Sequence, residues 1–315
     1  MAERVLVTGA LGYLGSIVCE HLLDEGYTVT ALDNLMYGAD RQGLYHLCAH
    51  PSFEFIKGDV RDESVMRPAV READVILHLA AIVGAPACDR DPELATSVNL
   101  GSARLLKRLC SPWQTVVFPN TNSGYGATSA DSYCTEDTPI NPISLYGRTK
   151  VDAESVLLEL PGTIALRLAT VFGMSPRMRL DLLVNHFVYT AVKEKYIVIF
   201  EKDFKRNFVH IRDVADCMLH CIKNGSRMAG RPYNLGLDAA NLSKEELALK
   251  VKQYVPDFYV HFAAIGQDPD KRNYVVSSAR LHEAGFAARR SLDQGIRELL
   301  KGYRMEGRAL FKNVA

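Results

Sequence analysis

The apolar positions in the first half of the chain follow two alternating patterns. Between short strand-like runs, apolar residues recur every three or four positions, as in Leu14, Ile17, Val18 and Leu22, which is typical of a helix with one buried face. Strands that alternate with helices predict βαβ units, so we expect an α/β fold with a doubly wound parallel sheet. The predicted strands, rich in β-branched residues, are Arg4–Thr8, Thr28–Leu32, Phe53–Lys57, Val75–Leu79, Thr115–Phe118 and Thr163–Leu168.

The pattern becomes less regular after Gly173. Helices are predicted over Leu180–Glu194 and Val214–Lys223, a strand over Asn207–Ile211, and a last amphipathic helix around Leu292–Leu300.

This change of pattern predicts two domains that share one core. We expect residues 1–174 to form the sheet domain, with residues 205–238 packing back on it. Residues 175–204 and 239–315 are expected to form a smaller α/β lobe that binds the substrate in a cleft between the two.

The composition narrows the function classes. The 315 residues include 37 basic and 37 acidic side chains, whereas a general nucleic-acid-binding protein normally has a basic surplus. No apolar run approaches the ~18 residues that span a bilayer, and the chain enters a strand-like run directly after its first residues. The seven cysteines form no Cys-x-x-Cys pair, and no cluster of metal ligands joins them. We expect a cytoplasmic protein with no membrane, nucleic-acid or metal partner.

A glycine-rich turn follows the first predicted strand. Gly9, Gly12 and Gly15 stand in a Gly-x-x-Gly-x-x-Gly pattern that opens a helix. There the first glycine permits a tight turn, the second lets backbone approach a pyrophosphate, and the third allows close helix–strand packing. The N–H groups at the start of the helix then bind phosphate. An ordinary βα turn could carry the same glycines.

Asp33 favours the nucleotide-binding interpretation. It ends the second predicted strand, 18 residues after Gly15, where a carboxylate can accept both hydroxyls of an adenosine ribose. The same charge would repel a 2′-phosphate. Asp59 and Val60, after the third strand, are placed to contact the adenine. We therefore expect a Rossmann domain that binds NAD rather than NADP.

A tyrosine and a lysine at helical spacing supply candidate catalytic chemistry. Tyr146 and Lys150 are four residues apart, so on a helix they share a face. A neighbouring cation favours the phenolate form, which can act as a general base. Any solvated helix can also carry this spacing, but here it follows the nucleotide motif.

With these residues in place, the chain resembles the extended short-chain dehydrogenase/reductase family, and within it the NAD-dependent nucleotide-sugar epimerases and dehydratases. The resemblance covers almost the whole chain. The segments that match the family's motifs are Thr8–Gly15, Leu32–Leu35, Gly58–Asp62, His78–Ala81, Asn120–Gly126, Tyr146–Lys150 and Arg206–Ala215.

The resemblance implies roles for individual residues. Tyr146 would be the base, Lys150 would hold the nicotinamide ribose, and Thr121 would take the position of the catalytic Ser/Thr. Asn99 matches a position that organises the active site. A strand-end hydroxyl and a helix residue that caps a neighbouring loop are the simpler interpretations of Thr121 and Asn99. Further cofactor contacts are expected from Tyr13, Leu14, Asn34, Leu79, Ala80 and Ala81.

The same resemblance implies which residues bind the substrate. Arg206 and Arg272 match two arginines that grip a substrate diphosphate, for which paired guanidinium donors are suited. For a single arginine, a surface ion pair is the commoner case. Contacts to the sugar or its phosphates are expected from Thr121, Asn122, Ser123, Thr170 and Asn185.

One departure from the family pattern bears on the reaction. Dehydratases and decarboxylases carry an acid beside the catalytic Thr, whereas this chain has Thr121-Asn122-Ser123. The expected activity is therefore nucleotide-sugar epimerisation, most simply at C4, through a keto sugar. The alternatives are a dehydratase with a relocated base, a keto-sugar reductase, and a non-catalytic NAD-binding protein. The resemblance also implies a homodimer built on the helices around Pro92–Cys110 and Ser144–Leu160.

Overall fold

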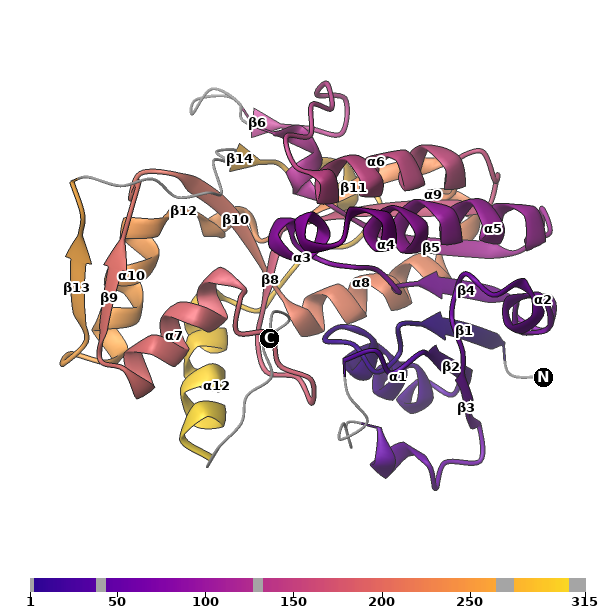
Figure 1. Cartoon of the computed structure of the whole chain (residues 1–315), viewed down its shortest axis with the longest axis horizontal. Coiled ribbons are helices and arrows are strands. Elements are labelled where there is room, and N and C mark those ends of the chain that lie inside the picture. The colour runs from indigo at the N-terminus through magenta and orange to yellow at the C-terminus, as the bar shows by residue number, and fades with distance from the viewer. Residues whose placement is uncertain (1–2, 38–43, 127–132, 265–274, 306–315) are drawn as a thin grey trace.

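The computed structural model describes residues 3–37, 44–126, 133–264 and 275–305. At its centre lies a seven-stranded, wholly parallel sheet in the order β11-β7-β5-β4-β1-β2-β3 (Figure 1). The chain begins in the middle and winds outward in both directions, so the predicted doubly wound α/β fold is confirmed. The strands are β1 (Arg4–Thr8), β2 (Thr28–Asp33), β3 (Phe53–Lys57), β4 (Val75–His78), β5 (Thr115–Thr121), β7 (Thr163–Leu168) and β11 (Arg231–Leu235).

Helices cover both faces of this sheet because alternate residues of each strand point to opposite sides. Val5 and Val7 of β1 join the cluster that contains residues of α1 (Gly15–Asp24) and α8 (Ile211–Lys223). Leu6 between them joins the second cluster instead. That cluster contains residues of α2 (Glu63–Arg71), α5 (Ser102–Leu109) and α6 (Leu145–Leu157).

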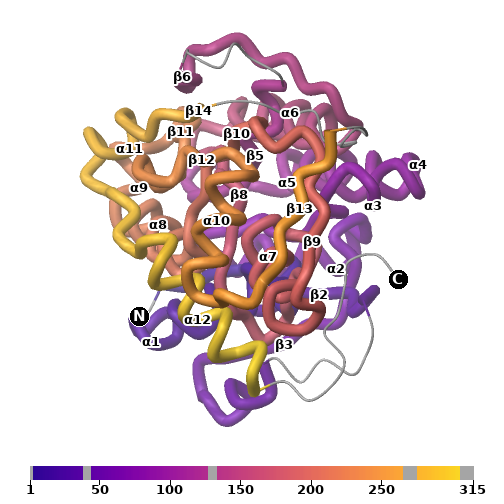
Figure 2. The backbone as a smooth tube through the Cα atoms, turned by 90° about the vertical axis from the view of Figure 1, so that its left-hand side faces the viewer, coloured from indigo at the N-terminus to yellow at the C-terminus, as the bar shows by residue number. Residues whose placement is uncertain are grey.

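A smaller assembly of helices and short sheets lies at the other end of the molecule and faces the viewer in Figure 2. β8 (Thr170–Phe172), β10 (Lys205–His210) and β12 (Asn241–Ser243) form one sheet, and β9 (Tyr196–Ile199) pairs with β13 (Tyr259–Phe262). β6 (Tyr133–Cys134) pairs with β14 (Val275–Val276). The helices here are α7 (Leu183–Lys193), α10 (Lys244–Tyr254) and α12 (Leu292–Met305), whereas α11 (Ala279–Glu283) packs beside β11 at the edge of the large sheet.

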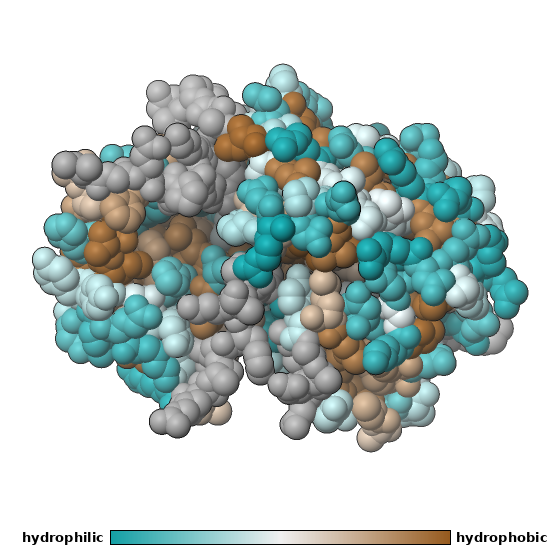
Figure 3. All heavy atoms as spheres, in the orientation of Figure 1, coloured by the Kyte–Doolittle hydropathy of each residue, from teal (hydrophilic) through white to brown (hydrophobic). Residues whose placement is uncertain are grey.

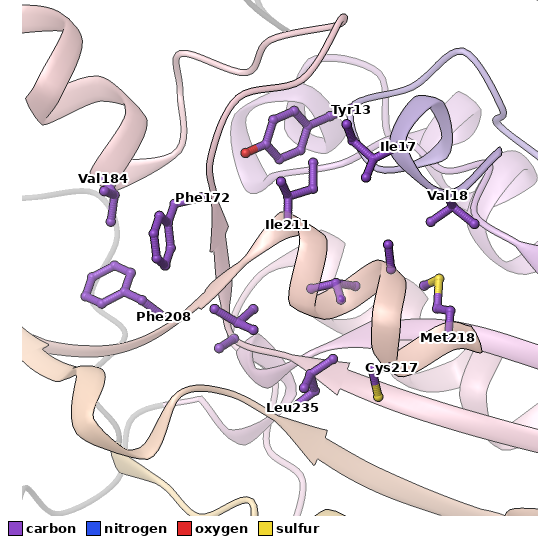
Figure 4. Close-up of a cluster of buried hydrophobic side chains, with 14 of the residues drawn as sticks. Tyr13, Ile17, Val18, Phe172, Val184, Phe208, Ile211, Cys217, Met218 and Leu235 are labelled. Carbon is purple, nitrogen blue, oxygen red and sulfur yellow. The ribbon is translucent and has the colours of Figure 1, made fainter. Parts of the chain in front are cut away.

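One hydrophobic cluster joins the two ends of the molecule. Figure 4 shows Tyr13, from the turn before α1, and Ile17 of α1 together with Ile211 of α8 and with Phe172 and Phe208 of β8 and β10. The same cluster continues through α7 into α12, the last helix that the structure describes.

Several element boundaries differ from the sequence prediction. β5 continues past Phe118 to Thr121, because β7 remains paired with it through Thr121 and Leu168. β11 was not predicted. It contains Pro232, which a central strand excludes but an edge strand tolerates, and β11 does lie at the edge of the sheet.

The surface of the described residues mixes polar and apolar side chains. Figure 3 shows hydrophobic residues scattered among hydrophilic ones, with one patch at the end formed by β9 and β13, where Val198 and Phe200 are exposed. None of the helices in the described ranges has the length and apolar character needed to cross a membrane.

Candidate functional site

A cavity of about 770 Å³ lies at the carboxyl ends of the central strands. This is where open α/β sheets bind ligands, since the chain crosses to opposite faces after β1 and β4. Most of the residues predicted to contact a cofactor line it: Gly9, Gly12, Tyr13, Leu14, Gly15, Asp33, Asn34, Asp59, Val60, Leu79, Ala80, Ala81, Tyr146 and Lys150. Thr121 and Thr170 line the same cavity.

The glycine-rich turn leaves no room for side chains. Gly9 has a φ of +67°, and a Cβ there would lie 2.8 Å from the backbone of Ala80. A Cβ on Gly15 would lie 2.8 Å from the Cα of Ala10. The turn therefore brings bare backbone to the floor of the cavity, which is the arrangement a pyrophosphate requires.

Asp33 is held at the edge of this turn. Its carboxylate accepts hydrogen bonds from the N–H of Leu11 at 3.0 Å and from the N–H of Leu35 at 2.8 Å. A carboxylate offers about four acceptor positions, so two remain for the hydroxyls of a ribose.

Asp59 lies beside it. Hydrogen bonds from Arg61, chiefly through its side chain, hold the pKa of Asp59 down to about 2, and Asn34 donates to the same carboxylate at 3.3 Å. Asp59 is therefore fully ionised at neutral pH, next to the place expected for the adenine.

Tyr146 and Lys150 project from α6 toward the sheet. Lys150 is buried, with its Nζ 3.9 Å from the ring centroid of Phe118 on β5. Burial lowers the pKa of Lys150 to about 7, although the charge of Glu154 opposes that effect. An ammonium with this pKa can change its protonation state in the working pH range of most enzymes.

Thr121 ends β5 and lines the same cavity. Its hydroxyl donates to the Oγ of Ser123 at 2.9 Å and accepts the N–H of Ser123 at 3.1 Å. Asn122, between them, is fully buried, and its amide has no hydrogen-bond partner within the ranges that the structure describes. Neither Asn122 nor Ser123 lines the cavity.

Asn99 does not reach the cavity. It lies in a π-helical segment, Ser97–Gly101, where its amide accepts the N–H of Ile82 at 2.8 Å and donates to the carbonyl of Ile82 and the hydroxyl of Thr149. This matches the simpler interpretation, a helix residue that caps a neighbouring loop. It ties the loop after β4 to α6.

Only some of the residues predicted to bind the substrate line the cavity. Asn185 is buried in hydrogen bonds to Gly173, Tyr13 and the backbone of Arg179, so it braces the loop after β8 instead of lining the cavity. Arg206 is buried on β10, also outside the cavity lining. Arg272 lies outside the described residues.

Two arginines that the sequence analysis missed do line the cavity. Arg177 and Arg179 belong to the loop after β8, and both are buried. The Cζ of Arg177 lies 4.3 Å from the ring centroid of Tyr37, which follows β2, and Arg179 forms an ion pair with Asp181. The only signal for the role of this loop was two closely spaced arginines in an otherwise apolar stretch.

This geometry fits a dinucleotide. The bare turn, the carboxylate of Asp33 and the two arginines can hold a pyrophosphate and a ribose, and Tyr146 and Lys150 line the same cavity.

Comparisons with known proteins agree with a dinucleotide-binding site. A family model described as "NAD dependent epimerase/dehydratase family" matches residues 5–236. The YtcB protein of Bacillus subtilis, described as an uncharacterized UDP-glucose epimerase, is 29% identical over 81% of each chain. A dTDP-glucose 4,6-dehydratase of Streptomyces griseus is 27% identical over 96% of this chain and 94% of its own.

A solved structure is similar as well. UDP-glucose 4-epimerase of Thermus thermophilus in complex with NAD has a TM-score of 0.81 and 25% identity, covering 96% of this chain and 99% of its own. The match of the family model to most of the chain shows that this protein belongs to the NAD-dependent epimerase/dehydratase family.

Proposed function

We propose that the protein is a nucleotide-sugar epimerase that inverts C4 through a transient keto sugar. The observation that supports the proposal is that Tyr146, Lys150 and Thr121 line one cavity with the glycine-rich turn, with an amide and a hydroxyl residue at the two positions after Thr121. Elimination of water needs a carboxylate to remove the C5 proton, whereas inversion at C4 does not.

The protein's own residues would act as follows. The phenolate of Tyr146 removes the proton from the sugar hydroxyl and later returns it, while the ammonium of Lys150 stabilises the phenolate. The hydroxyl of Thr121 hydrogen-bonds the reacting oxygen. NAD, when bound, supplies hydride-transfer chemistry.

A dehydratase with a relocated base is the second candidate. Asp89, in the short helix α3 (Ala85–Arg90), and Asp181 both line the cavity, so carboxylates are present even though none follows Thr121. The ion pair of Asp181 with Arg179 favours a role in binding for that residue.

The substrate is proposed to be a nucleoside-diphosphate sugar. The descriptions of two similar proteins, which name UDP-glucose and dTDP-glucose, support this class. Arg206 and Arg272 stay proposed contacts to the diphosphate, and residues 175–204 and 239–315 stay the proposed substrate lobe.

The test is to incubate the protein with UDP-, GDP-, dTDP- and CDP-hexoses in deuterated water and to analyse the products by mass spectrometry and NMR. An epimerase yields a sugar of unchanged mass with inverted C4 and no deuterium on the ring carbons. A product that has lost water, with deuterium at C5, would establish the dehydratase instead. Stoichiometric consumption of added reduced cofactor would indicate a reductase.

A further inference from the structure

A buried ion pair lies directly behind the catalytic end of β5. Glu154 on α6 and Arg167 on β7 have side chains only 6% and 8% exposed. The Nη2 of Arg167 donates to the Glu154 carboxylate at 2.7 Å, and its Nε donates at 3.1 Å. Burying two charges costs about as much as their attraction returns, so such a pair is weak evidence of a role in stability alone.

The same carboxylate also reaches the turn that presents Thr121. Asn120, the partner of Arg167 in the β5–β7 register, donates its side-chain amide to the Oε2 of Glu154. The amide oxygen of Asn120 accepts the N–H of Thr121 at 2.8 Å. Glu154 therefore fixes the rotamer of Asn120, and Asn120 fixes the backbone from which the Thr121 hydroxyl projects.

Glu154 also lies one helical turn after Lys150. Two other titratable groups face that ammonium from neighbouring elements, Cys88 on α3 and His78 on β4. Burial raises the pKa of Cys88 to about 11 and, with the charge of Lys150, lowers that of His78 to about 3, so both are neutral at neutral pH. Of the described groups that act on Lys150, Glu154 is then the charged one.

The other donors of Arg167 are already occupied. Its Nη1 donates to the hydroxyl of Tyr125 at 3.1 Å and to the carbonyl of Glu136 at 3.0 Å, and Tyr125 donates onward to Asn234 at 2.6 Å. These contacts anchor the guanidinium, so the Glu154 carboxylate is held in one place.

We infer that Glu154 is a positioning residue for the reaction: its carboxylate holds the turn that presents Thr121 and places a negative charge beside Lys150. The inference rests on the catalytic roles proposed above for Tyr146, Lys150 and Thr121.

The test uses the absorbance of the Tyr146 phenolate, which needs no identified substrate. The full-length protein and its Glu154→Gln variant are titrated with pH, and the titration of the matching Tyr146→Phe protein is subtracted from each. Without the carboxylate, Lys150 loses its proton at lower pH and stabilises the phenolate less. We expect phenolate formation to move up by roughly one pH unit in Glu154→Gln, at the lower end of what a nearby charge produces.

Glu136→Gln is the matched control. Glu136 is a buried carboxylate of the same network, but it contacts the N–H of Asn234 and Arg280 rather than the Lys150 region. It is expected to lower the free energy of unfolding and leave the Tyr146 titration in place. If Glu154→Gln behaves in the same way, the inference is wrong.

A second pair of variants covers the case in which Glu154→Gln does not fold. Glu154→Met combined with Arg167→Met removes both charges and leaves neither unpaired, and the same upward shift is expected. Asn120→Ala keeps the charge but releases the turn, so kcat for any sugar turned over in the product assay is expected to fall about tenfold with no shift in titration. A titration that stays in place in the double variant would overturn the inference. Full activity of Tyr146→Phe would instead refute the proposed function.

Discussion

The carboxylate of Asp33 accepts the backbone N–H of Leu11 across the glycine-rich turn at 3.0 Å. This bond fixes the distance between the residue expected to hold the ribose and the backbone expected to hold the pyrophosphate. A 2′-phosphate would have to approach a carboxylate that cannot move away.

Cofactor choice is the first prediction. We expect NAD(H) to bind at least about tenfold more tightly than NADP(H), or about 1.4 kcal/mol. Asp33→Ala should narrow this difference, because it removes both the ribose acceptor and the repulsive charge. Isothermal calorimetry with the two cofactors measures it, and equal affinity in the wild-type protein would contradict the assignment.

The second prediction concerns the two hydroxyl residues in the cavity. Tyr146→Phe is expected to lower kcat by at least ~100-fold, because the general base is lost. Thr121→Ala should cost roughly tenfold, the value of one hydrogen bond to the reacting oxygen. Ser155→Ala, an exposed change on the same helix, serves as the control. A larger loss for Thr121→Ala than for Tyr146→Phe would reverse the assigned roles.

We expect the buried charge of Lys150 to lower the free energy of unfolding, although the residue is proposed to serve catalysis. Its pKa of about 7 in the folded protein lies below the ordinary value of 10.5, so between these pH values the unfolded chain binds more protons and stability rises with pH. Lys150→Met is therefore expected to raise the free energy of unfolding by at least ~1 kcal/mol near neutral pH, with the gain shrinking toward alkaline pH. Urea unfolding of the cofactor-free protein over this pH range measures the effect.

Lys107→Met is the control for that experiment. Lys107 lies on the surface in an ion pair with Glu159, and such pairs contribute little to stability. If the two lysine variants change stability equally, burial of the Lys150 charge is not the cause.

The loop after β8 should help to retain the cofactor. Arg177 contacts Tyr37 from the other side of the cavity, so the two residues meet across it. We expect Arg177→Met to weaken NAD binding about tenfold, as the loss of one charge-assisted contact would. Arg4→Met, which removes an exposed ion pair with Glu72, should leave the affinity unchanged. Unaltered NAD binding in Arg177→Met would show that this arginine faces something else.

The predicted homodimer can be tested at Gly101. This residue lies in the π-helical segment between α4 (Pro92–Thr96) and α5, and a Cβ there would meet only the carbonyl of Thr96, at 3.9 Å. A large side chain therefore fits within one subunit but would project from the helical face expected at the interface. We expect Gly101→Arg to convert a dimer to a monomer with an unchanged circular dichroism spectrum. Light scattering that shows a monomeric wild-type protein would refute the dimer.

Leu157 is one apolar side chain that the predicted interface cannot use. The sequence offers Val151, Val156, Leu157 and Leu160 as apolar candidates, some of them expected to face the subunit's own sheet, and Leu157 is fully buried in that core. The remaining three are half-buried, and two of them, Val156 and Leu160, also pack against that core.

The parts of the site that the sequence predicts well are those specified by local spacing. The glycine turn, Asp33 and the Tyr146–Lys150 pair each occupy one turn or one strand end, and each lies in the cavity. Backbone geometry over a few residues is enough to place them.

The parts it missed depend on contacts between distant segments. Arg177 and Arg179 face the cavity because the hydroxyl of Tyr13 donates to the carbonyl of Gly173, 160 residues away, and docks the loop on α1. Asn185 and Asn99 are polar residues that could serve a ligand or a loop. Only the tertiary fold decides that both bind backbone.

The continuous hydrophobic cluster has a consequence for synthesis of the protein. It joins Val5 in the first strand to Tyr303 in the last described helix, so neither end of the sequence can complete its core without the other. As the chain leaves the ribosome, the apolar side of the growing sheet must wait for α7, then for α8 and last for α12. A nascent chain with such a face exposed is prone to aggregate, so the protein should depend on chaperones until α12 emerges.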